Sequence, residues 1–156
     1  MASNRHLGRI VALQSLYEFE FRSQSGDHDV IIDETVTRNL ERYKNEIDDT
    51  QFVTDLVDGV GKTLAELDVK LQPIAPEWPL DQIPRIDHTI LRMGLYELLH
   101  NSQNVPPKVV INESVELAKS FGSDNSSKFI NGVLGTAYRT LVLGESDDEN
   151  SKDWFN

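Results

Sequence analysis

The sequence predicts an all-α protein with six or seven short amphipathic helices in two packed helical subdomains. Apolar residues recur every three to four positions through most of the chain, and the strict alternation typical of strands is absent. Prolines at positions 73, 76 and 79, and again at 106 and 107, separate the helical stretches. We therefore expect one domain over residues 1–144 with a hinge at about 73–83, followed by an acidic, disordered tail at 145–156.

Three helices are expected before the hinge. The first covers residues 4 to about 23, with Arg5 and Arg9 together on the face opposite its apolar stripe. A second is capped by Asp33, and a third runs from Thr50 to residue 71, before the first proline. The predicted stripes are Leu7, Ile10, Leu13, Tyr17 and Phe21, then Val36, Leu40, Tyr43 and Ile47, then Phe52, Leu56, Val60, Leu64, Leu67 and Leu71.

Three more helices are expected after the hinge. One covers about 81–100, and the next begins at Pro107 and ends at Gly122 as its C′ residue. Ser126 or Ser127 can cap the last helix. The apolar positions of these helices are Ile86, Ile90, Met93 and Tyr96, then Ile111, Val115, Ala118 and Phe121, then Phe129, Val133 and Ala137.

Composition narrows the classes of function. The chain has 15 Lys and Arg against 26 Asp and Glu, a formal net charge of −11, so it repels nucleic acid at long range and any nucleic-acid site must be local. Cysteine is absent, and no apolar run reaches the roughly 20 residues of a membrane span. Because the first residues also lack the apolar region of a signal peptide, we expect a cytoplasmic protein that does not contact membranes.

No pattern in the sequence indicates an enzyme, a cofactor or a metal site. Residues 59–63 (GVGKT) end like a phosphate-binding loop, but the glycine required five positions before Gly61 is Leu56, and the segment lies in a helical stripe. The four histidines lack the spacing of metal ligands, and the many carboxylates are expected to be solvated. Catalytic residues are therefore not assigned.

Two short stretches carry the chemistry of a nucleic-acid site. Residues 5–9 (RHLGR) place two arginines in a first turn, where they oppose the helix dipole. Residues 126–131 (SSKFIN) place a cation, an aromatic ring and an amide at a helix start, where backbone N–H groups can bind phosphate. The alternatives are an ordinary surface helix start and a core position for Phe129 with Lys128 in solvent.

Several motifs, in order, resemble the NusB family of bacterial transcription antitermination factors over roughly residues 5–140. They are 12–18 (ALQSLYE), 90–98 (ILRMGLYEL), 105–113 (VPPKVVINE), 116–122 (ELAKSFG) and 128–134 (KFINGVL). The resemblance implies a NusB-like all-helical fold. It also implies binding to boxA-type single-stranded RNA of ribosomal RNA operons, a heterodimer with the ribosomal protein NusE, assembly with other Nus factors and RNA polymerase, and suppression of premature termination.

Site residues are carried over from the family by position. The implied RNA-binding residues are Arg5, His6, Arg9, Ser127, Lys128, Phe129 and Asn131. The implied partner-binding residues are Tyr17, Glu18, Arg85, Ile86 and Thr89. We expect the two RNA-binding groups to converge on one cationic, ring-bearing surface.

The sequence also departs from the family. Its arginine run is thin, Gly8 replaces a better helix former, and the tail is acidic, so we expect weak RNA binding without a basic partner. Three alternatives stay open: a protein-only helical adaptor that has lost RNA binding, a detached NusB-like module of a ribosomal RNA cytosine methyltransferase, and a homodimer formed through an apolar patch at Leu16 and Phe19.

Overall fold

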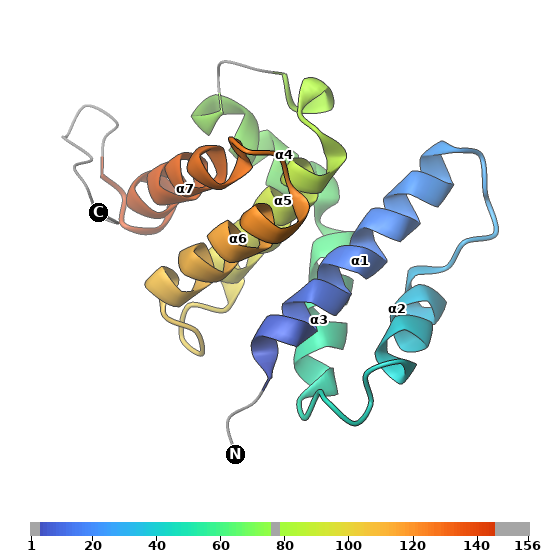
Figure 1. Ribbon diagram of the computed structural model, residues 1–156. Coiled ribbons are helices and arrows are strands. Elements are labelled where there is room, and N and C mark those ends of the chain that lie inside the picture. Colours follow the sequence, from blue (N-terminus) through green and yellow to red (C-terminus); the bar gives the residue numbers. More distant parts are fainter. Residues whose placement is uncertain (1–3, 76–78, 146–156) are drawn as a thin grey trace. The chain divides into compact units, whose positions relative to one another are not determined.

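The computed structural model describes residues 4–75 and 79–145, and within these ranges the chain forms seven α-helices and no strand (Figure 1). The all-α prediction is confirmed. The contacts divide the chain into two compact units, Met1–Thr63 and Leu64–Asn156. No helix in the described ranges is long and apolar enough to cross a membrane.

The division between the units precedes the proline-rich segment, so the described part of that segment lies within the second unit. It forms two short 3₁₀ turns, η1 (Gln72–Ile74) and η2 (Leu80–Gln82). The rest of the predicted hinge, residues 76–78, and all but one residue of the predicted tail, 146–156, lie outside the described residues. A single domain over residues 1–144 stays a prediction.

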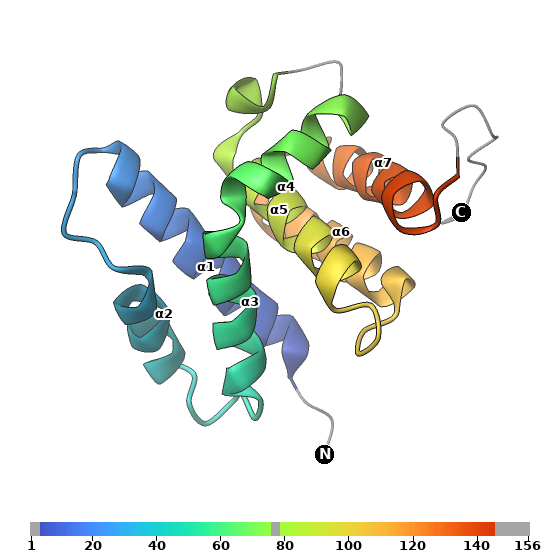
Figure 2. The ribbon, with the colours of Figure 1, turned by 180° about the vertical axis from the view of Figure 1, so that it is seen from behind.

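The first unit consists of α1 (Arg5–Gln24), α2 (Ile32–Glu41) and α3 (Thr50–Lys62), each of which packs against the other two (Figure 2). Side-chain caps are present at the N-termini of α1 and α3. Asn4 accepts a hydrogen bond from the Leu7 N–H, and Asp49 accepts one from the Phe52 N–H. The apolar core of this unit includes Val11, Leu13, Val36, Val53, Leu56, Val57 and Val60.

The predicted stripe of α1 was partly wrong. The buried residues of α1 include Gly8, Arg9, Ala12 and Leu16, whereas Phe21 is 50% exposed. Because α1 packs against both α2 and α3, its buried arc is wider than one stripe and lies toward the arginines. Burial of Leu16 also removes it from the apolar patch predicted for a homodimer.

The predicted bounds of α2 and α3 also need correction. Asp33 lies in the first turn of α2 rather than capping it, and α2 ends at Glu41, so Tyr43 and the buried Ile47 follow the helix. The single helix expected over 50–71 is two helices, because the backbone of Thr63 leaves the helical conformation (φ −124°, ψ 22°) and α4 begins at Leu64. The GVGKT stretch is helical up to Lys62, as predicted, but it lies at the end of α3 and not within a longer helix.

The second unit contains α4 (Leu64–Leu71), α5 (Arg85–His100), α6 (Pro107–Phe121), α7 (Ser126–Ala137) and a π-helical turn, η3 (Tyr138–Val142). The helix predicted from residue 81 begins at Arg85 instead, because Ile83, which precedes a proline, and Pro84 itself are extended and separate η2 from α5. The predicted start of α6 at Pro107 is confirmed. Most of α5 is buried, and it packs against α4, α6 and α7.

A partly buried polar cluster joins α4 to α5. The Asp68 carboxylate lies 2.7 Å from Nε2 of His88, and it accepts hydrogen bonds from Nε and Nη2 of Arg92 at 2.9 and 2.6 Å. Burial alone raises the pKa of Asp68, but the hydrogen bonds and charges of Arg92 and His88 outweigh it and lower this pKa to about 2. The ionised carboxylate therefore stabilises the contact between the two helices.

Candidate nucleic-acid interface

The start of α1 holds its two arginines against one aromatic ring. The guanidinium carbon of Arg5 lies 4.5 Å from the ring centroid of Phe52, and that of Arg9 lies 4.9 Å from it. Nη2 of Arg5 also lies 3.4 Å from an oxygen of Asp49. The local cost that the first-turn arginines impose on the helix is therefore offset by contacts with α3.

Gly8 brings α1 close to α3 at this point. A Cβ atom on Gly8 would lie 3.0 Å from Cγ2 of Val53, so a larger residue would crowd this side chain of α3. The Arg9 side chain is buried, only 3% exposed, while Arg5 is partly exposed and His6 is exposed. Direct contact of Arg9 with RNA stays a prediction, and it requires Arg9 to leave the Phe52 ring.

The start of α7 presents the second predicted group. Lys128 is exposed, and Ser127, Phe129 and Asn131 are half-buried. Phe129 lines a cavity of about 330 Å³ between the entry to α5 and the turn before α7. The ring is therefore not sealed in the core, and an unpaired base can approach it.

Ser126 does not cap α7 as predicted. The N-cap residue is Asn125, whose side chain makes no capping hydrogen bond, and Ser126 is the first helical residue. The Ser126 hydroxyl donates to Oδ2 of Asp87 at 3.0 Å and accepts from the Ser123 N–H at 2.9 Å. Burial raises the pKa of the Asp87 carboxyl, and the hydrogen bond from Ser126 offsets part of this rise.

Asp87 was missed as a site residue by the sequence reasoning, although a signal was present. An acidic residue at the third position of a helix commonly bonds back to the N-cap N–H. Here the N-cap residue is Pro84, which has no N–H, and Asp87 is the third helical residue. Its side chain is therefore available for a contact elsewhere in the fold.

Gly122, predicted as the C′ residue of this helix, is instead the C-cap of α6 with an extended backbone (φ −95°, ψ −169°). Gly122 matters because its missing side chain leaves room for Ser126. A Cβ atom on Gly122 would lie 2.6 Å from Cβ and Oγ of Ser126 and 2.8 Å from the Ala118 carbonyl oxygen. Glycine therefore lets Ser126 lie directly against the end of α6.

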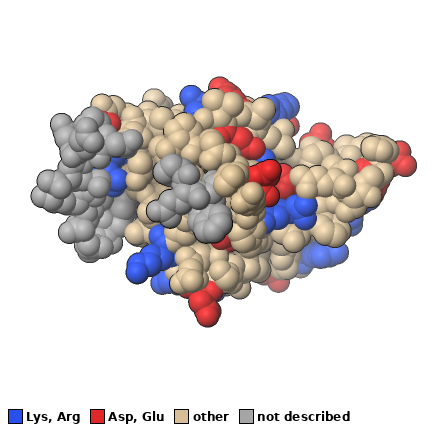
Figure 3. Space-filling model, turned by 90° about the horizontal axis from the view of Figure 1, so that it is seen from above, with Lys and Arg blue, Asp and Glu red and all other residues tan. Residues whose placement is uncertain are grey.

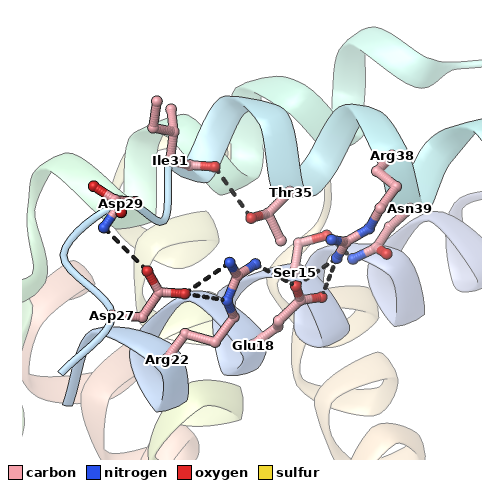
Figure 4. Close-up of polar contacts among 9 residues, drawn as sticks. All are labelled: Ser15, Glu18, Arg22, Asp27, Asp29, Ile31, Thr35, Arg38 and Asn39. Atoms are coloured by element: carbon pink, nitrogen blue, oxygen red, sulfur yellow. Dashed lines mark hydrogen bonds and ion pairs between the residues drawn. The ribbon is translucent and has the colours of Figure 1, made fainter. Parts of the chain in front are cut away.

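The predicted partner-binding residues of α1 already have contacts within the first unit. Glu18 is bonded to Arg22 of α1 and Arg38 of α2 (Figure 4). Burial raises the pKa of Glu18, but the hydrogen bonds of Arg38 and Arg22 outweigh this and lower it. The Tyr17 ring stacks on Phe21, with 6.4 Å between the centroids.

The predicted partner-binding residues of α5 lie in its first two turns. Arg85 and Ile86 are half-buried. Thr89 is buried, and its hydroxyl donates to the Arg85 carbonyl at 2.8 Å. Arg85 and Ile86 are therefore the accessible members of this group, and their contact with a partner stays a prediction.

The two RNA-binding groups belong to different units. Arg5, His6 and Arg9 are in the first unit, and the α7 residues are in the second, so their convergence on one surface stays a prediction. On the face shown in Figure 3, Lys and Arg side chains are interspersed with Asp and Glu.

Comparison with known proteins decides the family. A model of the NusB family matches residues 6–139. The chain belongs to the NusB family. One NusB relative, the transcription antitermination protein NusB of Chloroflexus aggregans, is 42% identical over 151 residues, which are 96% of this chain and 97% of the relative. That class of factor is not enzymatic, in agreement with the absence of a catalytic pattern in the sequence.

Solved NusB structures share the fold. NusB of T. maritima superposes with a TM-score of 0.78 at 26% identity, covering 89% of this chain and 93% of that one. A chain in a crystal structure of the antitermination factors NusB and NusE with dsRNA superposes with a TM-score of 0.74 at 23% identity, covering 87% and 96%. The NusB-like all-α fold predicted from the sequence is confirmed.

Proposed function

We propose that this NusB-family protein binds boxA-type RNA of ribosomal RNA operons together with NusE and suppresses premature transcription termination. The observation that carries the proposal is the start of α7, where the exposed Lys128 stands beside the accessible ring of Phe129. Lysine neutralises phosphate and the ring stacks on an unpaired base. Other Nus factors and RNA polymerase complete the proposed assembly.

The likeness to a NusB chain crystallised with NusE and dsRNA supports RNA and NusE as the partners. The formal charge of −11 and the burial of Arg9 against Phe52 limit what the protein contributes alone. NusE is proposed to supply the missing positive surface. The half-buried Arg85 and Ile86 at the start of α5 are the proposed contact points for it.

Titration of boxA-type RNA at several salt concentrations, with and without NusE, tests the proposal. We expect weak, salt-sensitive binding by the lone protein and much tighter binding by the pair. Tight, salt-insensitive binding by the lone protein would contradict it. A double-stranded RNA of the same sequence separates stacking on an unpaired base from backbone binding, because only the single strand offers a free base to Phe129.

A protein-only adaptor is the second candidate, and the burial of Arg9 favours it. An adaptor would bind NusE normally but would show no RNA-dependent gain in affinity.

Two further alternatives have tests of their own. Mass measurement in solution, with and without RNA, tests the alternative of a homodimer. Neighbouring genomic sequence would reveal a detached methyltransferase module.

A further inference from the structure

We propose that Asp87 is a positioning residue for RNA binding: through Ser126, it holds the start of α7 so that Lys128 and Phe129 face the RNA. This inference rests on the proposed function and adds to it a residue that does not itself contact RNA. Asp87 lies at the entry to α5, and Ser126 lies 39 positions later in the chain. Their hydrogen bond joins two elements that share no local sequence signal.

The Ser126 hydroxyl is the centre of this contact. It donates its single hydrogen to Oδ2 of Asp87, and it accepts from the Ser123 N–H. The Ser123 hydroxyl lies 3.1 Å away and is therefore the donor in that pair. Ser126 is only 2% exposed, so water cannot readily replace these partners. One hydroxyl thus fixes the α5 entry, the preceding turn and the first residue of α7.

Burial of the Asp87 carboxyl group costs free energy that a purely structural contact would not require. It is 5% exposed, and its second oxygen, Oδ1, is buried without a hydrogen-bond partner. Burying a carboxyl group with an unsatisfied oxygen costs free energy that an apolar side chain of similar shape would not. What an apolar residue cannot provide is the direction of a hydrogen bond, and that direction sets the position of Ser126.

The geometry connects this bond to the RNA-binding residues. Asp87, Ser126 and Phe129 line the same cavity of about 330 Å³, whose remaining wall includes Ile83 and Pro84. Lys128 and Phe129 follow Ser126 by two and three positions in the first turn of α7, so they move with it. Loss of the bond would let this turn shift against the α5 entry.

NMR of the free protein tests the positioning directly, without RNA. In Ser126→Ala and Asp87→Leu, we expect the ring resonances of Phe129 to shift, while Asp87→Asn, which still accepts from Ser126, should leave them nearly unchanged. Asp68→Asn is the matched control, because it disturbs another carboxylate bonded to α5 that has no contact with Ser126. Unchanged Phe129 resonances in Ser126→Ala would overturn the inference.

Binding of boxA-type RNA to the complex with NusE tests the consequence. We expect Ser126→Ala and Asp87→Leu to weaken binding about fivefold to tenfold, part of the contribution of one stacked base. Asp87→Asn should change it less than about twofold. In a Phe129→Ala background, Asp87→Leu should cost less binding than in the wild type, because only the contact of Lys128 is left to be displaced, whereas fully additive losses would overturn the inference.

The two experiments separate the inference from the proposed function. If the wild-type complex does not bind RNA but the Phe129 resonances respond to Ser126→Ala, the function fails and the positioning stands. If Asp87→Leu does not fold, Ser126→Ala still decides the matter, since it removes one buried hydroxyl and leaves the carboxyl in place.

Discussion

The guanidinium group of Arg5 lies over the ring of Phe52, 4.5 Å from its centroid, and so joins the start of α1 to α3. Arg9 shares the same ring at 4.9 Å. Two cations that the sequence offers as RNA contacts are therefore also structural groups of the first unit. Arg5 is partly exposed and is held in one orientation by the ring, which lowers the entropic cost of a later contact with phosphate.

A double-mutant cycle between these residues should measure this contact. We expect Arg5→Met and Phe52→Leu each to lower the free energy of unfolding, with a coupling energy of about 0.5–1 kcal/mol. Urea denaturation of the four proteins gives the value. A control cycle pairs Phe52→Leu with Arg38→Met, whose guanidinium bonds Glu18 instead. Equal coupling in both cycles would show that Arg5 has no specific interaction with the ring.

Lys128 should contribute one phosphate contact. Lys128→Ala is expected to weaken RNA binding and to reduce the slope of log K against log salt by about 0.7. Lys119→Ala, which removes another exposed lysine of the second unit from its pair with Glu116 in α6, should leave both quantities nearly unchanged. Identical salt slopes for Lys128→Ala and the wild type would place Lys128 away from the phosphates.

Two glycines of the second unit should respond oppositely to alanine. A Cβ atom on Gly94 in α5 would lie 2.6 Å from Cδ1 of Leu134 and 2.9 Å from Oγ of Ser114, so Gly94→Ala should destabilise by about 1–3 kcal/mol. Gly132 in α7 has no atom within 4 Å of such a Cβ, so Gly132→Ala should stabilise by about 0.5–1 kcal/mol. Thermal unfolding measures both. Similar effects of the same sign would show that the α5–α7 packing is looser than described.

The lowered pKa of Asp68 predicts how the stability of the protein depends on pH. Its folded pKa of about 2 lies below the ordinary value of 3.8, so its stabilising contribution is complete above pH 3.8 and is lost as pH falls toward 2. Asp68→Asn should lower the free energy of unfolding by about 2 kcal/mol at neutral pH, and the difference should shrink over that acidic range. Denaturation at pH 7 and pH 3 measures it. A difference that does not change with pH would exclude this ionisation as its source.

The sequence predicted those parts of the fold that depend on residues close together in the chain. Pro107 marks the start of α6 because proline suits a first turn, and the GVGKT stretch was assigned to a helix because its apolar spacing is helical. The break at Thr63 was not predicted, since the helical spacing of apolar residues continues through it, from Val60 to Leu64 and Leu67. Helix periodicity alone cannot show such a break.

Tertiary contacts explain the remaining differences between the predicted and the observed structure. The buried arc of α1 depends on two neighbouring helices, so a single stripe of apolar residues could not show that Arg9 is buried and Phe21 exposed. The bond between Asp87 and Ser126 depends on residues 39 positions apart. The sequence predicted which residues have RNA-binding chemistry, but not which residues hold them in place.

Replacement of Phe129 by alanine tests the central claim most directly. With boxA-type single-stranded RNA and NusE present, Phe129→Ala should lose about 1–3 kcal/mol of binding free energy, while the double-stranded form should lose little. Tyr43→Ala, at an aromatic residue of the first unit that is half-buried like Phe129 and has no proposed role in binding, is the matched control and should bind as the wild type does. Wild-type affinity of Phe129→Ala for the single strand would contradict the assignment of α7 as an RNA-reading element.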